Sequence, residues 1–197
     1  MSEEKRMVGS YEVTHSVHIG ENEIVMGEDL TNKTGHYYIV ANCRNTELYK
    51  SYENCLVSDD FTELAEVFAK RVTRQIDKLK DEQKNLPVTS FLRSDECAPL
   101  KIGENLKYKA VAVKPEVLRP EYRTASRQLY FASGGNGTRG YSRGSAVFCV
   151  NLYDNTHTRF ERSDIMGTLE PEKLPEWAKR NFDKLMEIDK NNKDMER

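Results

Sequence analysis

Alternating apolar and polar positions mark the first third of the chain. Residues 11–19 alternate, and one side carries Tyr11, Val13, His15, Val17 and Ile19. An apolar run begins at position 24 after a Gly-Glu-Asn-Glu turn signal. A further run over 36–43 joins β-branched and aromatic residues, which favour strands. We therefore expect a three-stranded antiparallel meander in this part of the chain.

The pattern then changes to the spacing of a helix. Asp60, with Glu63 three residues later, resembles a capping box at a helix start. Apolar residues recur every three or four positions behind it, up to about Lys84. This spacing predicts a long amphipathic helix with a charged outer face. Its apolar positions are Phe61, Leu64, Phe68, Val72, Ile76 and Leu79.

The second half of the chain repeats the strand pattern and ends in a helical one. Residues 85–106 contain two prolines and predict an irregular crossing. Strand patterns follow at 108–113, 128–132, 146–152 and 158–162, and a last helix carries Trp177, Phe182, Leu185 and Ile188. The predicted fold class is α+β: two antiparallel meanders packed with the long helix and the C-terminal helix. We expect a single domain over 1–190 and a frayed polar tail over 191–197.

Composition adds that the chain can form a core and gives no sign of a membrane span. Of 197 residues, 38% are hydrophobic, and no apolar run approaches the roughly 18 residues that cross a bilayer. The first residues lack the apolar core of a secretory signal, so we expect a cytoplasmic protein that does not enter a membrane. The four cysteines form no CxxC pair, so we expect free thiols, no metal and no cofactor.

Charge is unevenly spread along the chain. The net charge is −2, yet residues 101–144 carry nine Lys and Arg against three Glu. A basic segment of this kind suits a polyanionic partner. The alternative is that charges distant in sequence mingle on the folded surface.

A glycine-rich stretch, GGNGTRGYSRG over 134–144, is the first candidate site. Five of the eleven glycines lie here, and glycine lets backbone amides turn toward a ligand while arginine binds phosphate. The spacing is not that of a P-loop. The alternative is a long mobile hairpin tip. The candidate binding residues are Gly134, Gly135, Gly137, Arg139, Tyr141 and Arg143.

Three arginines with a four-residue spacing form the second candidate. If 120–128 is helical, they share one face, with Tyr122 and Tyr130 interleaved, and guanidinium with aromatic suits bases and phosphates. A solvated face paired with Glu116 and Glu121 is an equal alternative. The candidate binding residues are Arg119, Arg123 and Arg127.

The segment HTRFERSD offers the only arrangement suited to catalysis. On a strand, His157, Arg159, Glu161 and Ser163 share one face, so His157 could act as a general base with Arg159 or Arg162 as a phosphate clamp. A metal-independent ribonuclease uses such groups. An exposed strand also alternates in this way, and we expect no catalytic residues on the leading interpretation.

Three segments carry a resemblance to known proteins: VSDDFTELAEVFAKRV, VAVKPEVLRPEYRTASRQLYFASGGNGT and RGSAVFCVNLYDNTHTRFERSDIMGTLEPEKLPEWA. They resemble a family of small accessory proteins carried by integrative and conjugative elements and plasmids of gut Firmicutes. The similarity covers most of the chain, and the family supplies no catalytic residues to carry over. The resemblance implies that the gene is carried on the same mobile elements as genes for plasmid-transfer, anti-restriction and anti-CRISPR proteins.

Three functions follow as hypotheses. The first is an anti-CRISPR protein that inhibits a type II effector nuclease by stoichiometric binding to the effector, its nucleic acid or both. The second is a metal-independent nuclease acting on RNA or DNA through His157. The third is a non-catalytic conjugation accessory protein. The sequence leaves the oligomeric state open.

Overall fold

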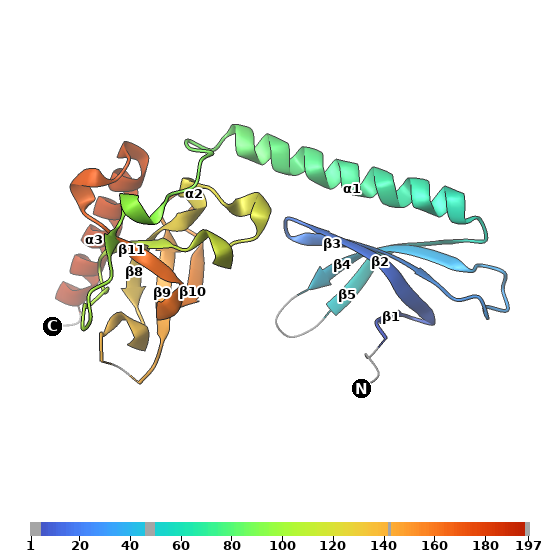
Figure 1. Ribbon diagram of the computed structural model, residues 1–197, viewed down its shortest axis with the longest axis horizontal. Helices are drawn as coiled ribbons and strands as arrows, with labels where there is room; N and C mark the ends of the chain where they lie inside the picture. The colour runs from blue at the N-terminus through green and yellow to red at the C-terminus, as the bar shows by residue number, and fades with distance from the viewer. Residues whose placement is uncertain (1–4, 46–49, 142, 196–197) are drawn as a thin grey trace. The chain divides into compact units, whose positions relative to one another are not determined.

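The chain folds into α+β structure, which confirms the predicted fold class. The computed structural model describes residues 5–45, 50–141 and 143–195. The chain divides into two compact units, residues 1–85 and residues 86–197, whereas the sequence predicted one domain over 1–190. Each unit has its own sheet and its own long helix, so each can bury a core by itself (Figure 1).

Unit 1 is an antiparallel meander of five strands. The strand order β1-β2-β3-β4-β5 follows the sequence. The three predicted strands correspond to β2, β3 and β4, while β1 and β5 were not predicted. The fifth strand is exposed along most of its length, so no buried face gave it an alternating pattern. The bounds are β1 Met7–Val8, β2 Tyr11–Ile19, β3 Asn22–Glu28, β4 Tyr38–Asn45 and β5 Lys50–Ser58.

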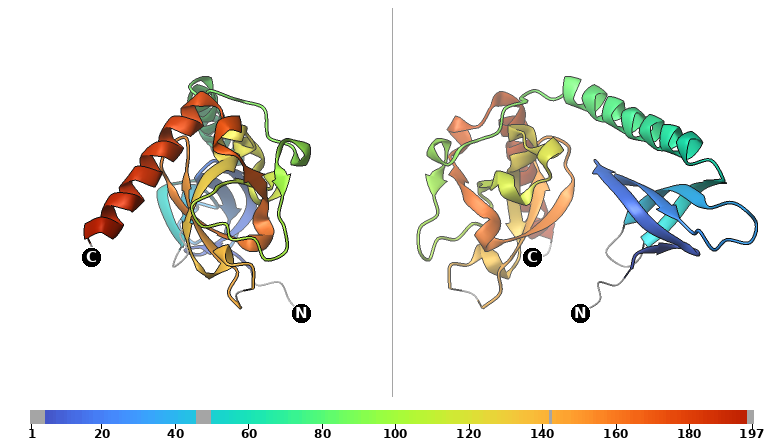
Figure 2. Two further views of the ribbon diagram at one scale, coloured as in Figure 1. Left: turned by 90° about the vertical axis from the view of Figure 1, so that its left-hand side faces the viewer. Right: turned by 45° about the vertical axis from the view of Figure 1, so that its right-hand side comes forward.

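The predicted long helix of unit 1 is confirmed as α1, Phe61–Lys84. Asp60 caps it by accepting hydrogen bonds from the backbone N–H groups of Thr62 and Glu63 at 2.7 and 3.2 Å. The helix lies along one face of the sheet (Figure 2), where Leu64 is fully buried against the strands. The opposite face of the sheet buries a second apolar cluster: Val8, Tyr11, Val25, Ile39, Ala41 and Cys43.

Unit 2 contains a six-stranded antiparallel sheet of order β10-β9-β8-β7-β11-β6. The four predicted strands are present, but the sheet is not a simple meander. A fifth strand, β11, returns across the sheet and pairs with β7 on one side and β6 on the other. The bounds are β6 Ala98–Pro99, β7 Ala110–Val113, β8 Leu129–Gly134, β9 Ala146–Asn151, β10 His157–Glu161 and β11 Ile165–Leu169.

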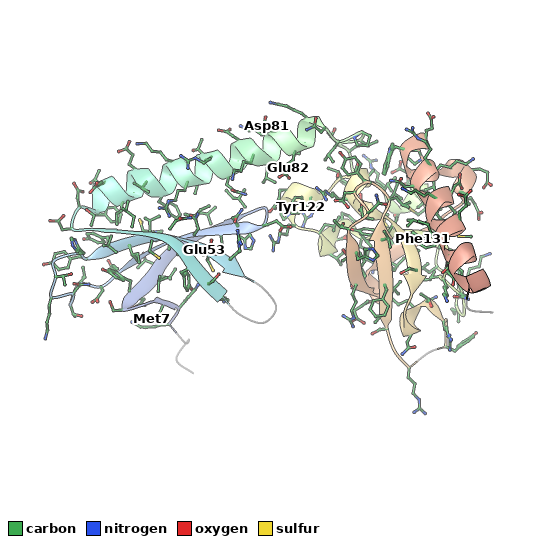
Figure 3. All side chains as sticks on the ribbon, turned by 180° about the vertical axis from the view of Figure 1, so that it is seen from behind. Met7, Glu53, Asp81, Glu82, Tyr122 and Phe131 are labelled. Atoms are coloured by element: carbon green, nitrogen blue, oxygen red, sulfur yellow. The ribbon has the colours of Figure 1, made fainter. Side chains whose placement is uncertain are left out.

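Both faces of this sheet are covered. Helix α3, Glu176–Met195, covers one face, where the rings of Phe131 and Phe182 meet edge to face at 5.6 Å between centroids (Figure 3). The other face is covered by the connecting segments that carry Leu100, Leu106 and Leu118. The predicted frayed tail was wrong for 191–195, because α3 continues to Met195, and 196–197 lie outside the described residues.

Short helices fill the connections of unit 2. Prolines begin three of them, as expected for a residue whose fixed backbone angle suits a first helical turn. No helix in the described residues is both long and apolar enough to cross a membrane. The short helices are η1 Ser94–Glu96, η2 Pro115–Val117, η3 Pro120–Tyr122, α2 Ala125–Gln128, η4 Asn136–Thr138, η5 Arg162–Asp164 and η6 Pro171–Lys173.

Candidate functional site

The glycine-rich loop of unit 2 is closely packed against itself. A Cβ on Gly135, whose φ is +98°, would lie 2.3 Å from the carbonyl oxygen of Ala146. A Cβ on Gly137 would lie 2.0 Å from that of Ser145. These two glycines are therefore required because the two arms of the loop meet, and their presence does not by itself indicate a phosphate cradle. Gly134 has open space around it.

Arg162 fixes the position of this loop through hydrogen bonds to backbone carbonyl oxygens. Its guanidinium donates to the carbonyl oxygens of Gly137 and Thr138 at 2.8 and 3.3 Å, and to that of Glu104 at 2.8 Å. These hydrogen bonds join the glycine-rich loop to a second loop, which carries Glu104 and lies within residues 85–106, the region predicted to be irregular. Arg162 thus has a structural role and is not available as a phosphate clamp.

The two loops also meet through their backbones. Gly103 and Gly140 form an isolated antiparallel bridge, and a Cβ on Gly140 would lie 2.1 Å from the Cα of Gly103. We name residues 101–105 and 139–143 the two-loop tip; residue 142 lies outside the described residues. Two large apolar side chains stand out on it, Ile102 at 93% exposure and Tyr141 at 85%. Arg139 and Arg143 are exposed as well.

A shallow pocket of about 520 Å³ opens on the two-loop tip. Asn105, Arg139 and Tyr141 supply its side chains. The tyrosine ring lies over Gly103, where an added Cβ would be 2.8 Å from Cε2 of the ring. An aromatic ring, a guanidinium and a carboxamide around one pocket can stack on a base, contact phosphate and bond a base edge.

Arg139 and Arg143 of the two-loop tip have no acidic partner among the described residues. In unit 2, the ion pairs among the described residues are Lys109–Glu104, Arg127–Asp154 and Arg159–Glu161. None of these pairs includes Arg139 or Arg143. Two cations of the basic segment, Lys109 and Arg127, are thus neutralised within the fold, whereas Arg139 and Arg143 contribute positive charge to the tip.

The predicted arginine face is wrong. Helix α2 covers only Ala125–Gln128, and the prolines at 115 and 120 begin separate short helices, so no continuous helix aligns the three side chains. Arg123 donates to the carbonyl oxygens of Pro115 and Leu118 at 3.0 and 3.2 Å. Arg127 forms an ion pair with Asp154, and its guanidinium lies 5.4 Å from the ring centroid of Tyr122.

Arg119 remains exposed before η3, and it contributes to no face shared with the other two arginines. Arg123 and Arg127 instead hold the connection between β7 and β8 in place. Tyr122 is part of this structural arrangement (Figure 3). The four-residue spacing of the three arginines therefore does not mark one face of a helix; two of them stabilise a loop.

The predicted catalytic strand forms, but its groups are engaged with one another. His157 and Arg159 lie on one face of the edge strand β10, as predicted, and both side chains are exposed. Arg159 forms an ion pair with Glu161, and a hydrogen bond from Ser145 is the largest cause that lowers the pKa of Glu161. Ser163 lies in η5 and not on the strand. With Arg162 also occupied, neither guanidinium of the nuclease hypothesis is poised as a clamp for His157.

Sequence reasoning missed the contribution of residues 103–105 to this site, and it missed an exposed aromatic residue elsewhere in unit 2. Asn105 and the bridge at Gly103 lie in a stretch predicted to be irregular, and a single glycine there was the only available signal. Phe148 is 52% exposed on β9, opposite Arg159 on the neighbouring strand. It lies within an apolar run that reads as a buried strand, so no pattern distinguished it from core residues.

The placement of the cysteines and of other possible metal ligands bears on the sequence predictions of free thiols and of no metal. Within residues 5–45, 50–141 and 143–195, no group of three or more His, Cys, Asp or Glu side chains is arranged to hold a metal ion. All four cysteines are free, as predicted. Burial raises the pKa of the Cys97 thiol to about 11 and that of Cys149 to about 12, so both are poor nucleophiles.

Comparisons with protein-family models, with curated proteins and with solved structures find no match for this chain. The resemblance to accessory proteins of conjugative elements therefore stays a hypothesis.

Proposed function

We propose that this protein is a non-catalytic binding protein of the cytoplasm that contacts an unpaired nucleic-acid strand at the two-loop tip of unit 2. The observation that carries the proposal is the pocket shared by Asn105, Arg139 and Tyr141, beside cations that form no ion pair among the described residues. The target is the nucleic acid of a host defence nucleoprotein.

The chemistry of this pocket suits an unpaired strand better than a duplex. Tyr141 is exposed on a loop, and stacking of a base on such a ring contributes about 1–3 kcal/mol per base. A base inside a duplex cannot reach the ring, because both of its faces are already stacked. Arg139 and Arg143 then supply contacts to the backbone phosphates.

The type of nucleoprotein follows from the resemblance described above. A type II CRISPR effector holds a guide RNA and displaces a single DNA strand during target recognition. A protein that occupies the effector or these strands blocks target engagement without any chemistry. We therefore propose an anti-CRISPR inhibitor that acts by stoichiometric binding.

A binding assay tests the tip directly. Replacing Arg139 and Arg143 with glutamine should weaken binding of a labelled single strand of RNA or DNA, measured by fluorescence polarisation. Loss of two phosphate contacts should also make the negative slope of log K against log salt shallower by about 1.4. The matched control replaces Lys179 and Arg180, which are exposed cations of α3, with glutamine. This control protein should bind the strand as the wild type does. Equal affinities for all three proteins would exclude the tip as the binding surface.

A cleavage assay tests the target. Adding the protein to a purified, guide-loaded type II effector should stop DNA cleavage, with inhibition complete near equimolar protein. Inhibition at a small fraction of the effector concentration indicates turnover instead, and loss of that activity in His157→Ala would support the nuclease. If the effector is unaffected while strand binding persists, the conjugation accessory function replaces the inhibitor.

A further inference from the structure

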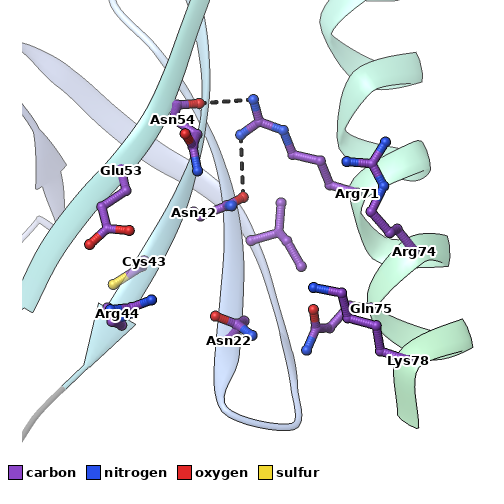
Figure 4. A pocket seen from close by; sticks show the side chains of 11 residues that line it. Asn22, Asn42, Cys43, Arg44, Glu53, Asn54, Arg71, Arg74, Gln75 and Lys78 are labelled. Atoms are coloured by element: carbon purple, nitrogen blue, oxygen red, sulfur yellow. Dashed lines mark hydrogen bonds between the residues drawn. The ribbon is translucent and has the colours of Figure 1, made fainter. Parts of the chain in front are cut away.

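A polar cleft in unit 1 lies between α1 and the strands that it covers. The cleft has a volume of about 610 Å³, within the range of roughly 300–1,000 Å³ that is usual for small-molecule sites. Figure 4 shows Arg71, Gln75 and Lys78 extending from α1 toward the strands that carry Asn22 and Asn42. All the residues that line it belong to unit 1, so the site is independent of the two-loop tip.

The charge of this cleft is strongly positive. Four cations line it, Arg44, Arg71, Arg74 and Lys78, against the single carboxylate of Glu53. The ion pairs of α1 among the described residues are Lys70–Glu66, Lys80–Asp77 and Lys84–Asp81. The cationic side chains of the cleft take part in none of them, so the cleft attracts an anion.

Arg71 is fixed at the wall of the cleft without an acidic partner among the described residues. Its guanidinium donates to Oδ1 of Asn42 at 3.3 Å and to the carbonyl oxygen of Asn54 at 2.8 Å. Burial lowers the pKa of Arg71, and the positive charge of Arg74 lowers it further. Two neutral acceptors orient this guanidinium but do not balance its charge, so an anionic ligand would stabilise it.

The shape of the cleft selects the end of a ligand over the middle of a strand. The first turns of α1 pack directly on the sheet, where Leu64 is buried against Ile24, Met26 and Val40. Apolar side chains therefore fill the space between the first turns of the helix and the strands, and the cleft lies beside the later turns. A terminal phosphate can enter a cleft that is filled on one side, whereas a strand threaded along the helix would need open space on both sides.

We propose that this cleft binds the terminal phosphate of a nucleotide, either free or at the 5′ end of a strand. Arg71 and Arg74 contact the phosphate, and Lys78 adds a third cation. The carboxamides of Asn22 and Gln75, which both donate and accept hydrogen bonds, face the sugar and the base.

Calorimetric titration with AMP at fixed ionic strength tests the proposal. One molecule of AMP should bind per chain, and inorganic phosphate should compete with it. Replacing both Arg74 and Lys78 with glutamine should weaken AMP binding at least about tenfold, since each removes a charge-assisted hydrogen bond. Both side chains lie outside the buried core, so the variant should keep its fold, as circular dichroism can verify.

The matched control replaces Lys80 and Lys84 of the same helix, which form ion pairs with Asp77 and Asp81 and do not line the cleft. This control variant loses two positive charges, as the Arg74 and Lys78 variant does, and should bind AMP as the wild type does. Absence of AMP and phosphate binding, or an equal loss in both variants, would overturn the proposal. Arg139→Gln with Arg143→Gln should leave AMP binding unchanged, which separates this site from the proposed function.

Short oligonucleotides with and without a 5′ phosphate distinguish the two sources of the ligand. They are added to the Arg139→Gln, Arg143→Gln variant, so that strand binding at the two-loop tip does not contribute. If the phosphorylated strand binds more tightly than AMP, the site recognises a strand end. If AMP binds as tightly as the strand, the site recognises a free nucleotide. A 5′-hydroxyl strand that binds as well as its phosphorylated form, and is displaced by AMP, would contradict recognition of a terminal phosphate.

Discussion

Arg6 and Glu23 show how single residues hold unit 1 together. The guanidinium donates to both carboxylate oxygens of Glu23, at 2.6 and 2.8 Å, and to the hydroxyl oxygen of Tyr52 at 2.9 Å. The hydrogen bond from Arg6 is the largest cause that lowers the pKa of Glu23, and Ser16 and His18 lower it further. The charged form of Glu23 is thus favoured in the folded protein.

Glu23→Gln should lower the free energy of unfolding by about 2 kcal/mol near neutral pH, because it leaves Arg6 without its charged partner. The folded pKa of Glu23 lies below its unfolded value. The stabilisation is therefore present above the unfolded pKa and disappears as the pH falls through the folded one. Urea unfolding of both proteins at several pH values measures the difference, which should shrink in acid. A difference that stays constant with pH would refute the role of the ion pair.

At the scale of elements, two glycines decide where the side chains of the tip are placed. Gly103 has a φ of +80°, and the Tyr141 ring occupies the space beside its Cα. The ring can lie over the second loop only because position 103 has no side chain. Gly35, in unit 1, has nearly the same φ of +84° but open space around it.

Gly103→Ala should displace Tyr141 and weaken binding of a single strand about as much as Tyr141→Ala does. Gly35→Ala is the matched control, because it carries the same backbone strain without a displaced ring. Each glycine variant should lose about 1 kcal/mol of stability. Polarisation assays compare the affinities, and thermal unfolding compares the stabilities. If both glycine variants bind strands equally well, Tyr141 does not define the site.

At the scale of the whole molecule, the chain is two units, each with its own core. The five-stranded sheet and α1 bury one set of clusters, and the six-stranded sheet and α3 bury another. Each unit also carries one of the two candidate sites. The proposed functions should therefore be separable.

Fragments cut between Asn85 and Leu86 should fold on their own, because each hydrophobic cluster consists of residues from one unit. Amide resonances of each fragment should be dispersed and should overlay on those of the intact chain. The fragment 1–85 should keep AMP binding, and the fragment 86–197 should keep strand binding. An unfolded fragment that gains structure only when its counterpart is added would show that the chain is one cooperative domain.

The sequence by itself determined the elements that bury one face. The period of α1 and the alternation of β2 follow from which side chains must leave water, and this information lies within a few neighbouring residues. The same local reasoning placed His157 and Arg159 on one face of β10. It could not find β5, most of whose residues are exposed.

The tertiary structure alone decided what the charged and glycine residues do. Arg127 and Arg162 were equal to Arg139 as cations in the sequence, yet the fold gives the first an aspartate and the second three carbonyl oxygens. Asn105 and Tyr141 line one pocket, and Arg71 donates a hydrogen bond to Asn42, although each pair is far apart in the sequence. An element's period is set by its own backbone geometry, whereas a side chain's partner is set by whichever distant segment the fold brings within a few ångströms.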